Sequence, residues 1–332
     1  MKVALYPCIR DDGIGTYIRG ISPFLPVTSI DYPGRALSPF QFIKPLPSGY
    51  DLYHVPHFLV PLFCGRKKVV CTIHDIIPLQ DNFGYRRWKQ GFLARRIEWS
   101  VRRADAIICD SKTTKEALLE RFRGIIEPRV IYPGVDQPLT KASSDSSPYA
   151  FPYFISVGRR RPHKNTKRIL EAFAAIQGAF DSHLVLIGKV EPSDSDLLEL
   201  AAKLKVLHKV HFSGFLTAEK LAMHYRFATA LLFPSLLEGF GLPVLEAMSY
   251  GCPVITSNCS SLLEIAGNAA ALVNPVDLNA ISTAMLRIAQ DAEYGKQLTQ
   301  KGYLNIQRFT WEACAAKTLE IYRTVLGIKE SV

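Results

Sequence analysis

Long hydrophobic runs are absent from this sequence. No stretch of its 332 residues approaches the roughly 18 consecutive apolar residues that a transmembrane helix needs. The apolar N-terminus, Met1–Tyr6, is also too short for the hydrophobic region of a secretory signal peptide. We therefore expect a cytoplasmic protein, with any membrane contact peripheral and at the inner face of the cytoplasmic membrane.

Paired cysteines and nucleic-acid-binding motifs are also missing. The 7 cysteines are odd in number, include no Cys-x-x-Cys pair and lie mostly in apolar runs, which favours a reducing compartment. The formal net charge is +10, but no recognisable nucleic-acid-binding motif accompanies the arginines. We do not expect nucleic acid as a partner.

A complete dinucleotide-binding fingerprint is lacking. Gly13 and Gly15 form a G-x-G, which suggests a Rossmann oxidoreductase. The third glycine and a ribose-binding acid about 20 residues further on are not found. We therefore discount an oxidoreductase function. The sequence also contains no internal repeat.

Strand-like and helical patterns alternate along the chain. Hydrophobic residues make up 48% of the sequence, enough for two well-filled cores. Strands that alternate with helices favour parallel, doubly wound sheets. The fold class is therefore α/β, with two Rossmann-like domains that face a central cleft. The apolar runs expected to be strands are Val3–Tyr6, Val27–Ile30, Leu52–Val55, Val69–Ile73, Ala106–Cys109, Val130–Tyr132, Tyr153–Val157, Leu184–Ile187, Val210–Phe212, Ala230–Phe233, Val254–Thr256 and Ala271–Val273.

Two carboxylates eight residues apart form the most informative feature of the chain. An apolar run precedes Glu238, two glycines follow it, and Pro243 suits the start of a helix that carries Glu246 in its first turn. The N-terminus of that helix offers backbone N–H groups to an anion. The spacing does not suit the facing acids of a glycosidase, so we interpret both glutamates as binding groups for hydroxyls.

Polar residues also follow other predicted strands, where ligands bind in such sheets. After Tyr153–Val157 comes a cationic loop in which Arg159 and Lys164 could neutralise a diphosphate. The further basic residues of this loop could add phosphate contacts or carry solvated charge, and we expect them to be solvated: Arg160, Arg161 and His163. His74 and Asp75 follow Val69–Ile73; alone, such a pair is more often structural.

A basic segment spans residues 86–103. Seven arginines and lysines against Glu98 give it a net charge of +6, and aromatic residues are interleaved with them. Two interpretations stay open: an amphipathic helix on an anionic membrane, or a covering helix with a solvated face.

Together, these motifs resemble the retaining glycosyltransferases of family 4, which have the GT-B fold. The similarity spans nearly the whole chain. Within this family, the sequence most resembles the bacterial mannosyltransferases of surface polysaccharide and lipopolysaccharide synthesis. The matching segments are the E-x7-E of Glu238 and Glu246, Gly251–Ile255, Val157–Arg159, Lys164–Asn165, Val130–Asp136, Thr72–Asp75, Ser260–Gly267 and Arg308–Trp311.

The resemblance implies a domain division and a role for each matched residue. An acceptor-side domain would cover 1–140, with 309–332 crossing back to it, and a donor domain would cover 150–308, after a linker at 136–148. Glu246 would bind ribose and Glu238 the donor sugar. Arg159 and Lys164 would hold the diphosphate, and His74 would contact the sugar near the reacting carbon. The residues expected to approach phosphate or sugar through their backbone are Gly13, Gly15, Phe240, Gly241 and Leu242.

The implied reaction transfers a sugar from a nucleoside diphosphate to an acceptor hydroxyl with retention, by front-face displacement. GDP-mannose is the favoured donor, ahead of UDP-glucose, UDP-N-acetylglucosamine and GDP-fucose. The acceptor would be a glycan or a lipid-linked molecule. No cofactor or metal is expected, because no Asp-x-Asp motif flanks a predicted strand. The alternative is a non-catalytic nucleotide-sugar-binding paralogue that serves as a partner subunit of another transferase.

Overall fold

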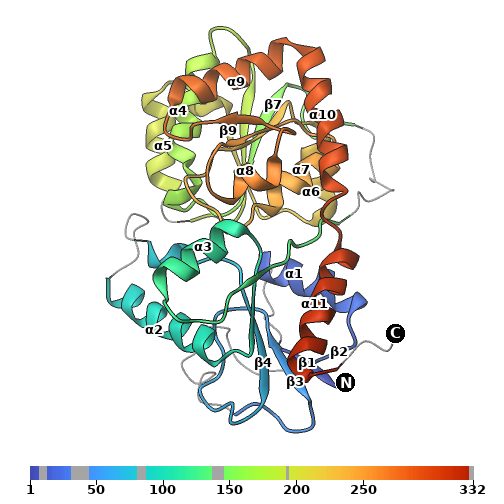
Figure 1. Cartoon of the computed structure of the whole chain (residues 1–332). Helices are drawn as coiled ribbons and strands as arrows, with labels where there is room; N and C mark the ends of the chain where they lie inside the picture. Colours follow the sequence, from blue (N-terminus) through green and yellow to red (C-terminus); the bar gives the residue numbers. More distant parts are fainter. Residues whose placement is uncertain (7–12, 31–44, 81–86, 137–145, 192–193, 329–332) are drawn as a thin grey trace. The chain divides into compact units, whose positions relative to one another are not determined.

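The computed structural model describes residues 1–6, 13–30, 45–80, 87–136, 146–191 and 194–328 (Figure 1). Two compact units can be separated. The N-terminal unit comprises Met1–Gly134 together with Phe309–Val332, and the C-terminal unit comprises Val135–Arg308. Most of the expected linker, residues 137–145, lies outside the described residues.

The N-terminal unit is built on a parallel six-stranded sheet. Its strand order is β2-β1-β3-β4-β5-β6. Parallel strands are joined by crossover helices, which cover both faces, so the strands read as continuous apolar runs. The strands are β1 (Val3–Leu5), β2 (Val27–Ser29), β3 (Leu52–Val55), β4 (Lys68–Ile73), β5 (Ala106–Cys109) and β6 (Arg129–Val130).

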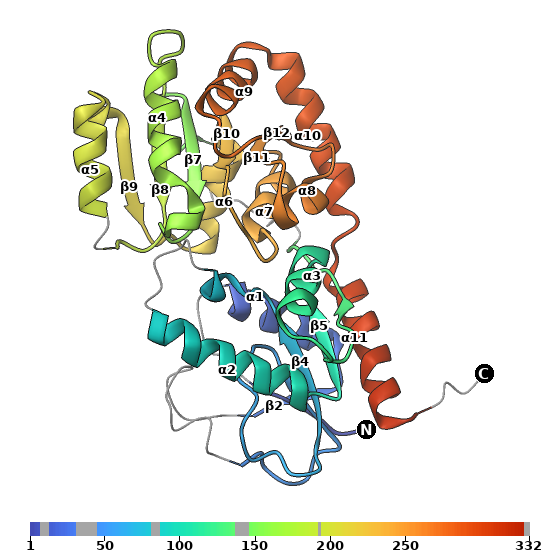
Figure 2. The same ribbon diagram turned by 60° about the vertical axis from the view of Figure 1, so that its left-hand side comes forward.

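Two helix pairs cover the faces of this sheet. Alternate residues of one strand point to opposite faces, so Val69 and Cys71 join one buried cluster and Val70 joins the other. The first cluster also contains residues of α2 (Arg87–Arg103) and α3 (Lys112–Arg121). The second contains residues of α1 (Gly13–Ile21) and the C-terminal α11 (Trp311–Leu326). Figure 2 shows the ribbons of these two helices.

Helix α11 packs closely on α1. A Cβ added to Gly20 would lie 2.1 Å from the indole of Trp311, so only glycine permits this approach. Further along α11, the hydroxyl of Tyr322 lies 2.6 Å from Nδ1 of His54 in β3, and the other ring nitrogen of His54 lies 2.7 Å from the hydroxyl of Thr72. The last helix is thus an integral part of the N-terminal unit.

The C-terminal unit repeats this architecture. Its sheet has the order β12-β11-β10-β7-β8-β9, and each described strand pair is parallel. The main buried cluster joins the sheet to α4, α5, α9 and α10 (Figure 2). The strands are β7 (Tyr153–Val157), β8 (His183–Ile187), β9 (Val210–Gly214), β10 (Ala230–Phe233), β11 (Val254–Ser257) and β12 (Ala271–Val273). The helices are α4 (Thr166–Ile176), α5 (Asp194–Lys203), α6 (Ala218–Phe227), α7 (Leu242–Ser249), α8 (Ser260–Ala266), α9 (Leu278–Gln290) and α10 (Ala292–Ile306).

The prediction of two parallel, doubly wound sheets is confirmed. Each expected apolar run forms a strand in the described part of the chain, with ends that differ by at most two residues. In the C-terminal sheet the strand order reverses between β7 and β10. Such a switch point leaves a crevice outside the carboxyl ends of the two strands, where ligands bind in open α/β sheets.

Candidate active site

Lys164 and Glu238 meet at the switch point of the C-terminal sheet. The loop after β7 carries Lys164, and the loop after β10 carries Glu238. Their Nζ and Oε1 atoms are 2.7 Å apart, with 21% and 9% of the two side chains exposed. The Lys164 ammonium also lies 4.6 Å from the ring centre of Phe233, within the range of a cation–π contact. Two side chains predicted to bind donor thus form one largely buried ion pair.

Backbone and side-chain hydrogen bonds hold the loop after β7 in place. Leu236 donates its backbone N–H to the carbonyl of His163 at 2.7 Å, which joins this loop to the one after β10. The amide of Asn165 donates to the carbonyls of Pro234 and Pro275 at 3.0 and 2.7 Å. These bonds fix the backbone on both sides of Lys164, so its ammonium is positioned before any ligand arrives.

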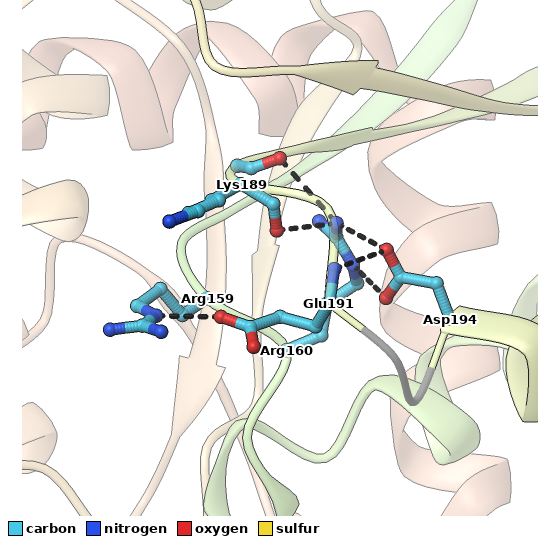
Figure 3. A network of polar contacts seen from close by, with 6 residues as sticks. Arg159, Arg160, Lys189, Glu191 and Asp194 are labelled. Carbon is cyan, nitrogen blue, oxygen red and sulfur yellow. Dashed lines mark hydrogen bonds and ion pairs between the residues drawn. The ribbon is translucent and has the colours of Figure 1, made fainter.

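Arg159 stands beside this pair with an acidic partner of its own. Its Nε donates to Oε1 of Glu191 at 2.7 Å, as Figure 3 shows, and 56% of the Arg159 side chain remains exposed. The bond and charge of Arg159 lower the pKa of Glu191 despite its partial desolvation. Arg159 and Lys164 line one small pocket with Ser156, Thr166 and Phe233.

The expectation that Arg160 and His163 are solvated is wrong. Arg160 is 8% exposed and His163 is 7% exposed, whereas Arg161 is exposed as expected. The Arg160 guanidinium binds Asp194 with two bonds of 2.6 and 2.7 Å and also donates to the carbonyl of Lys189 at 2.8 Å (Figure 3). Asp194 in turn accepts the backbone N–H of Glu191 at 3.0 Å. Arg160 therefore holds the segment that presents Glu191 to Arg159.

Replacing Asp194 by alanine is expected to lower the free energy of unfolding by about 3 kcal/mol, because it leaves the guanidinium of Arg160 buried without its carboxylate. Urea denaturation of the whole chain measures this. Asp181 is the matched control, since its bond to Lys209 is at the surface, with 86% of the Asp181 side chain exposed. Asp181→Ala should leave the denaturation midpoint unchanged. Equal midpoints for the two variants would contradict the role of the Arg160 pair.

Glu246 lies in α7 and has a tyrosine partner. It is the fifth residue of the helix, so it sits beyond the first turn in which we expected it. The hydroxyl of Tyr225, in α6, donates to its Oε2 at 2.9 Å. Desolvation raises the pKa of Glu246, and the bond from Tyr225 only partly opposes this. The carboxylate is therefore desolvated and oriented, which suits an acceptor for ligand hydroxyls.

The turn between the two glutamates is held by the start of α8. Gly241 has a φ of +117° and directly precedes α7, a conformation that favours glycine. The Ser261 hydroxyl contacts the carbonyls of Glu238 and Phe240 at 3.0 and 2.8 Å. At the start of α7, Pro243 has no N–H, and Val244 donates its N–H to the carbonyl of Gly241 at 2.9 Å. The N–H of Leu242 is therefore the helical amide that this turn can present to an anion.

The N-terminal unit places His74 at the carboxyl edge of its own sheet. Nδ1 of His74 lies 2.5 Å from Oδ2 of Asp110, and Nε2 lies 2.9 Å from the carbonyl oxygen of Pro56. Burial acts to lower the pKa of His74, but the charge and hydrogen bond of Asp110, aided by Pro56, raise it above its ordinary value. The Asp110 contact thus favours the protonated form of His74. Its contribution to stability is present below the unfolded-state pKa and is lost as pH rises through the raised one.

Gly13 and Gly15 are not loop residues in the structure. Both lie in the first turn of α1, and Gly15 is buried. Residues 7–12, which precede them, lie outside the described residues. Both glycines belong to the helix rather than to the loop before it, because the helical spacing of Ile14, Tyr17 and Ile21 extends back to Gly13.

Sequence reasoning missed four residues of these sites: Tyr225, Glu191, Asp194 and Asp110. Asp110 directly follows β5, so the rule of inspecting each strand end could have found it. Tyr225 contacts Glu246 from 21 positions away, and Asp194 contacts Arg160 from 34 positions away. No local pattern marks either pair.

Solved structures place this architecture in the GT-B fold. The sucrose-phosphate synthase of Thermosynechococcus elongatus superposes with a TM-score of 0.79 at 22% identity, covering 99% of this chain and 100% of that one. HepE from Anabaena, in complex with UDP and glucose, superposes with a TM-score of 0.76 at 17% identity over 98% of this chain and 100% of that one. The GT-B fold expected from the motifs is confirmed.

Family models and curated relatives then define the family. Glycosyltransferase Family 4 matches residues 10–137, and Glycosyl transferases group 1 matches residues 143–305. The two models together cover most of the chain, which therefore belongs to the group 1 and family 4 glycosyltransferases. O-antigen chain mannosyltransferase B of Escherichia coli is 28% identical over 292 residues, which are 82% of this chain and 74% of that protein. The serotype-specific mannosyltransferase WbdA of Escherichia coli is 28% identical over 78% of this chain, which spans only 34% of WbdA.

Proposed function

We propose that this protein transfers a hexosyl residue, with GDP-mannose as the favoured donor, to a hydroxyl of a glycan or lipid-linked acceptor. The Lys164–Glu238 pair at the switch point is the observation that carries this proposal. It puts a cation for the diphosphate and a carboxylate for the sugar hydroxyls side by side. The names of the mannosyltransferase relatives support mannose as the sugar.

The chemistry follows from these groups. The bond between the anomeric carbon and the phosphate oxygen breaks, the acceptor oxygen bonds to the same face, and the leaving phosphate takes the acceptor proton. Negative charge grows on the diphosphate, where Arg159 and Lys164 would stabilise it, as fixed donors do in many active sites. These two cations supply the charge for which other transferases use a metal, so we propose transfer without one.

Each site cation already has a carboxylate partner in the structure, Glu238 for Lys164 and Glu191 for Arg159. A diphosphate would share these cations rather than meet bare charges. Glu238 can keep one oxygen on Lys164 while the other accepts a sugar hydroxyl. Glu246, oriented by Tyr225, would accept the ribose hydroxyls. The nucleotide and the sugar would thus be bound by separate carboxylates.

A thermal-shift panel of nucleoside diphosphates and their sugars tests donor choice. We expect GDP and GDP-mannose to raise the melting temperature more than the uridine pair. At a ligand concentration 100 times Kd the stabilisation is about 2.7 kcal/mol. A larger shift with UDP-sugars would overturn the proposed donor. No shift with any nucleotide would overturn the proposal that this site binds a nucleotide sugar. Binding without turnover would instead favour the non-catalytic paralogue.

An anionic membrane surface is the partner proposed for α2, in keeping with a place at the cytoplasmic membrane. Of the described helices, none is long and apolar enough to cross a bilayer. Arg96 is buried and donates to the carbonyl of Val60 at 2.8 Å, and Arg103 donates to the carbonyls of Gly65 and Lys67. These two arginines fasten the helix to its own unit, so they are not available to lipid headgroups.

The rest of α2 carries an aromatic and basic face. Its members recur at helical spacing and are all exposed, which puts them on one side of the helix: Trp88, Phe92, Arg95, Trp99 and Arg102. The indole N–H of Trp99 donates to the carbonyl of Pro61 at 3.3 Å, which brings the exposed Leu62 and Phe63 beside this face. Exposed aromatic rings flanked by arginines suit the interface of an anionic bilayer.

Reversing Arg95 and Arg102 to glutamate is expected to weaken binding to phosphatidylglycerol vesicles by about 30-fold or more, since each basic residue near such a surface contributes about 1 kcal/mol. Flotation measures the bound fraction. Lys296→Glu with Lys301→Glu, two exposed lysines of α10, changes the net charge equally and should leave binding unchanged. Equal loss in both double variants would show that net charge, rather than this face, attracts the vesicles.

A further inference from the structure

His74, Asp110 and Pro56 directly follow three neighbouring strands of the N-terminal sheet. Pro56 comes after β3, His74 after β4 and Asp110 after β5, and these strands are adjacent in the sheet. Their carboxyl ends lie at one edge, where ligands bind in doubly wound sheets. The three residues are therefore parts of one arrangement at this edge.

The two bonds of the His74 ring define its protonation state. One ring nitrogen faces the carboxylate of Asp110 at 2.5 Å, and the other faces a main-chain carbonyl at 2.9 Å. Both partners accept hydrogen bonds, so the ring donates from both nitrogens, which only the imidazolium can do. A shared proton belongs on the imidazole rather than the carboxylate, because the ordinary pKa of histidine is the higher by about 2.6.

Burial makes the Asp110 contact strong. The Asp110 side chain is 6% exposed and that of His74 is 15% exposed, so water screens the pair little. The ring of Tyr17, from α1, meets the His74 ring edge to face with centroids 5.0 Å apart. Asp110 and Tyr17 thus restrict the ring from two sides, through β5 and α1.

The other titratable groups near His74 do not compete for its charge. Asp75, the next residue, adds a further favourable charge. His54 lies in the neighbouring strand β3, but burial lowers its pKa to about 3, so it stays neutral at physiological pH. Burial likewise keeps the Tyr17 phenol neutral, because it raises the pKa well above the ordinary value. The cation at this edge is therefore His74 alone among these groups.

We infer that Asp110 is a positioning residue for His74, which it keeps protonated and oriented so that Nε2–H can pass from the carbonyl of Pro56 to an oxygen of the bound substrate. This inference rests on the proposed transfer reaction for its substrate and goes beyond it in assigning Asp110. A cation that donates through Nε2 stabilises negative charge on that oxygen. It also excludes His74 as the base that activates the acceptor.

An NMR titration of the histidines in the full chain tests the pairing without any need for turnover. His74→Gln identifies the His74 signal. In the wild type this signal should titrate above the ordinary value of about 6.5, and in Asp110→Asn its midpoint should fall by about one pH unit or more. A wild-type midpoint at or below the ordinary value overturns the inference, and this result does not depend on whether the variant folds. An unchanged midpoint in folded Asp110→Asn also overturns it.

Steady-state kinetics of Asp110 variants distinguish a positioning role of Asp110 from a role in folding alone. In Asp110→Asn, kcat should fall by about 10-fold or more while KM changes by less than about threefold, and the loss of kcat on the alkaline side should begin at lower pH. Asp110→Glu should recover part of kcat, because it restores the carboxylate. An unchanged pH profile would overturn the assignment. Absence of transfer by the wild type with every donor would overturn the proposed function and leave the NMR result standing.

Discussion

Lys164→Ala should lower kcat for sugar transfer by about 100-fold or more, which is the cost of removing one fixed charge from a developing anion. The ammonium is 2.7 Å from Glu238 and rests against Phe233, in a loop held on both sides by hydrogen bonds. An oriented, largely buried cation stabilises charge more strongly than a mobile surface lysine. Steady-state transfer from GDP-mannose measures the effect.

The control for Lys164 is Lys167, an exposed lysine in the first turn of α4. Lys167→Ala removes the same charge three positions along the chain and should leave kcat unchanged. Circular dichroism checks that both variants fold, because the change at Lys164 leaves the Glu238 carboxylate buried without its partner. Activity of Lys164→Ala within threefold of Lys167→Ala would contradict the diphosphate role.

The second large effect concerns nucleotide affinity. Glu246→Ala should weaken GDP binding by about 10- to 100-fold, because hydrogen bonds to a charged group contribute about 1.5–3 kcal/mol each. Calorimetry on the whole chain measures Kd. Tyr225→Phe keeps the carboxylate and removes only its orienting bond, so it should cause a smaller loss. Unchanged affinity in Glu246→Ala would refute the ribose role.

Affinity for GDP should also depend on pH through Glu246. Desolvation raises its pKa, so the carboxylate is protonated at a less acidic pH than an ordinary glutamate. Protonation weakens it as an acceptor for hydroxyls. Kd should therefore rise as pH falls through this raised pKa, and Glu246→Ala should abolish that dependence.

The fold was predictable because its signals are local. Strands buried on both faces form apolar runs such as Leu52–Val55 and Ala230–Phe233, and these are continuous in the sequence. The two glutamates and the cationic loop could likewise be found, since each follows a strand. Their meeting at the switch point depends on strand order, which the family resemblance supplied.

The burial of individual basic residues could not be predicted, because it depends on contacts between residues far apart in the sequence. Arg160 and Arg161 are neighbours in one basic run, yet Arg160 is buried and Arg161 is exposed. The difference comes from Asp194, which lies at the start of α5. In α2, Arg95 and Arg96 differ in the same way, because one helix face packs on the sheet. The net charge of a segment includes buried and exposed basic residues alike. The packed structure shows which of them stabilise the fold and which can contact a ligand or a membrane.

We propose that the C-terminal unit binds an activated sugar, which the protein transfers with retention and without a metal. The most direct measurement follows GDP-mannose by proton NMR in EDTA, with octyl α-mannoside as the acceptor. We expect release of GDP and an α-linked product, which has the same anomeric configuration as the donor. A β-linked product, or transfer that requires an added divalent cation, would contradict this proposal.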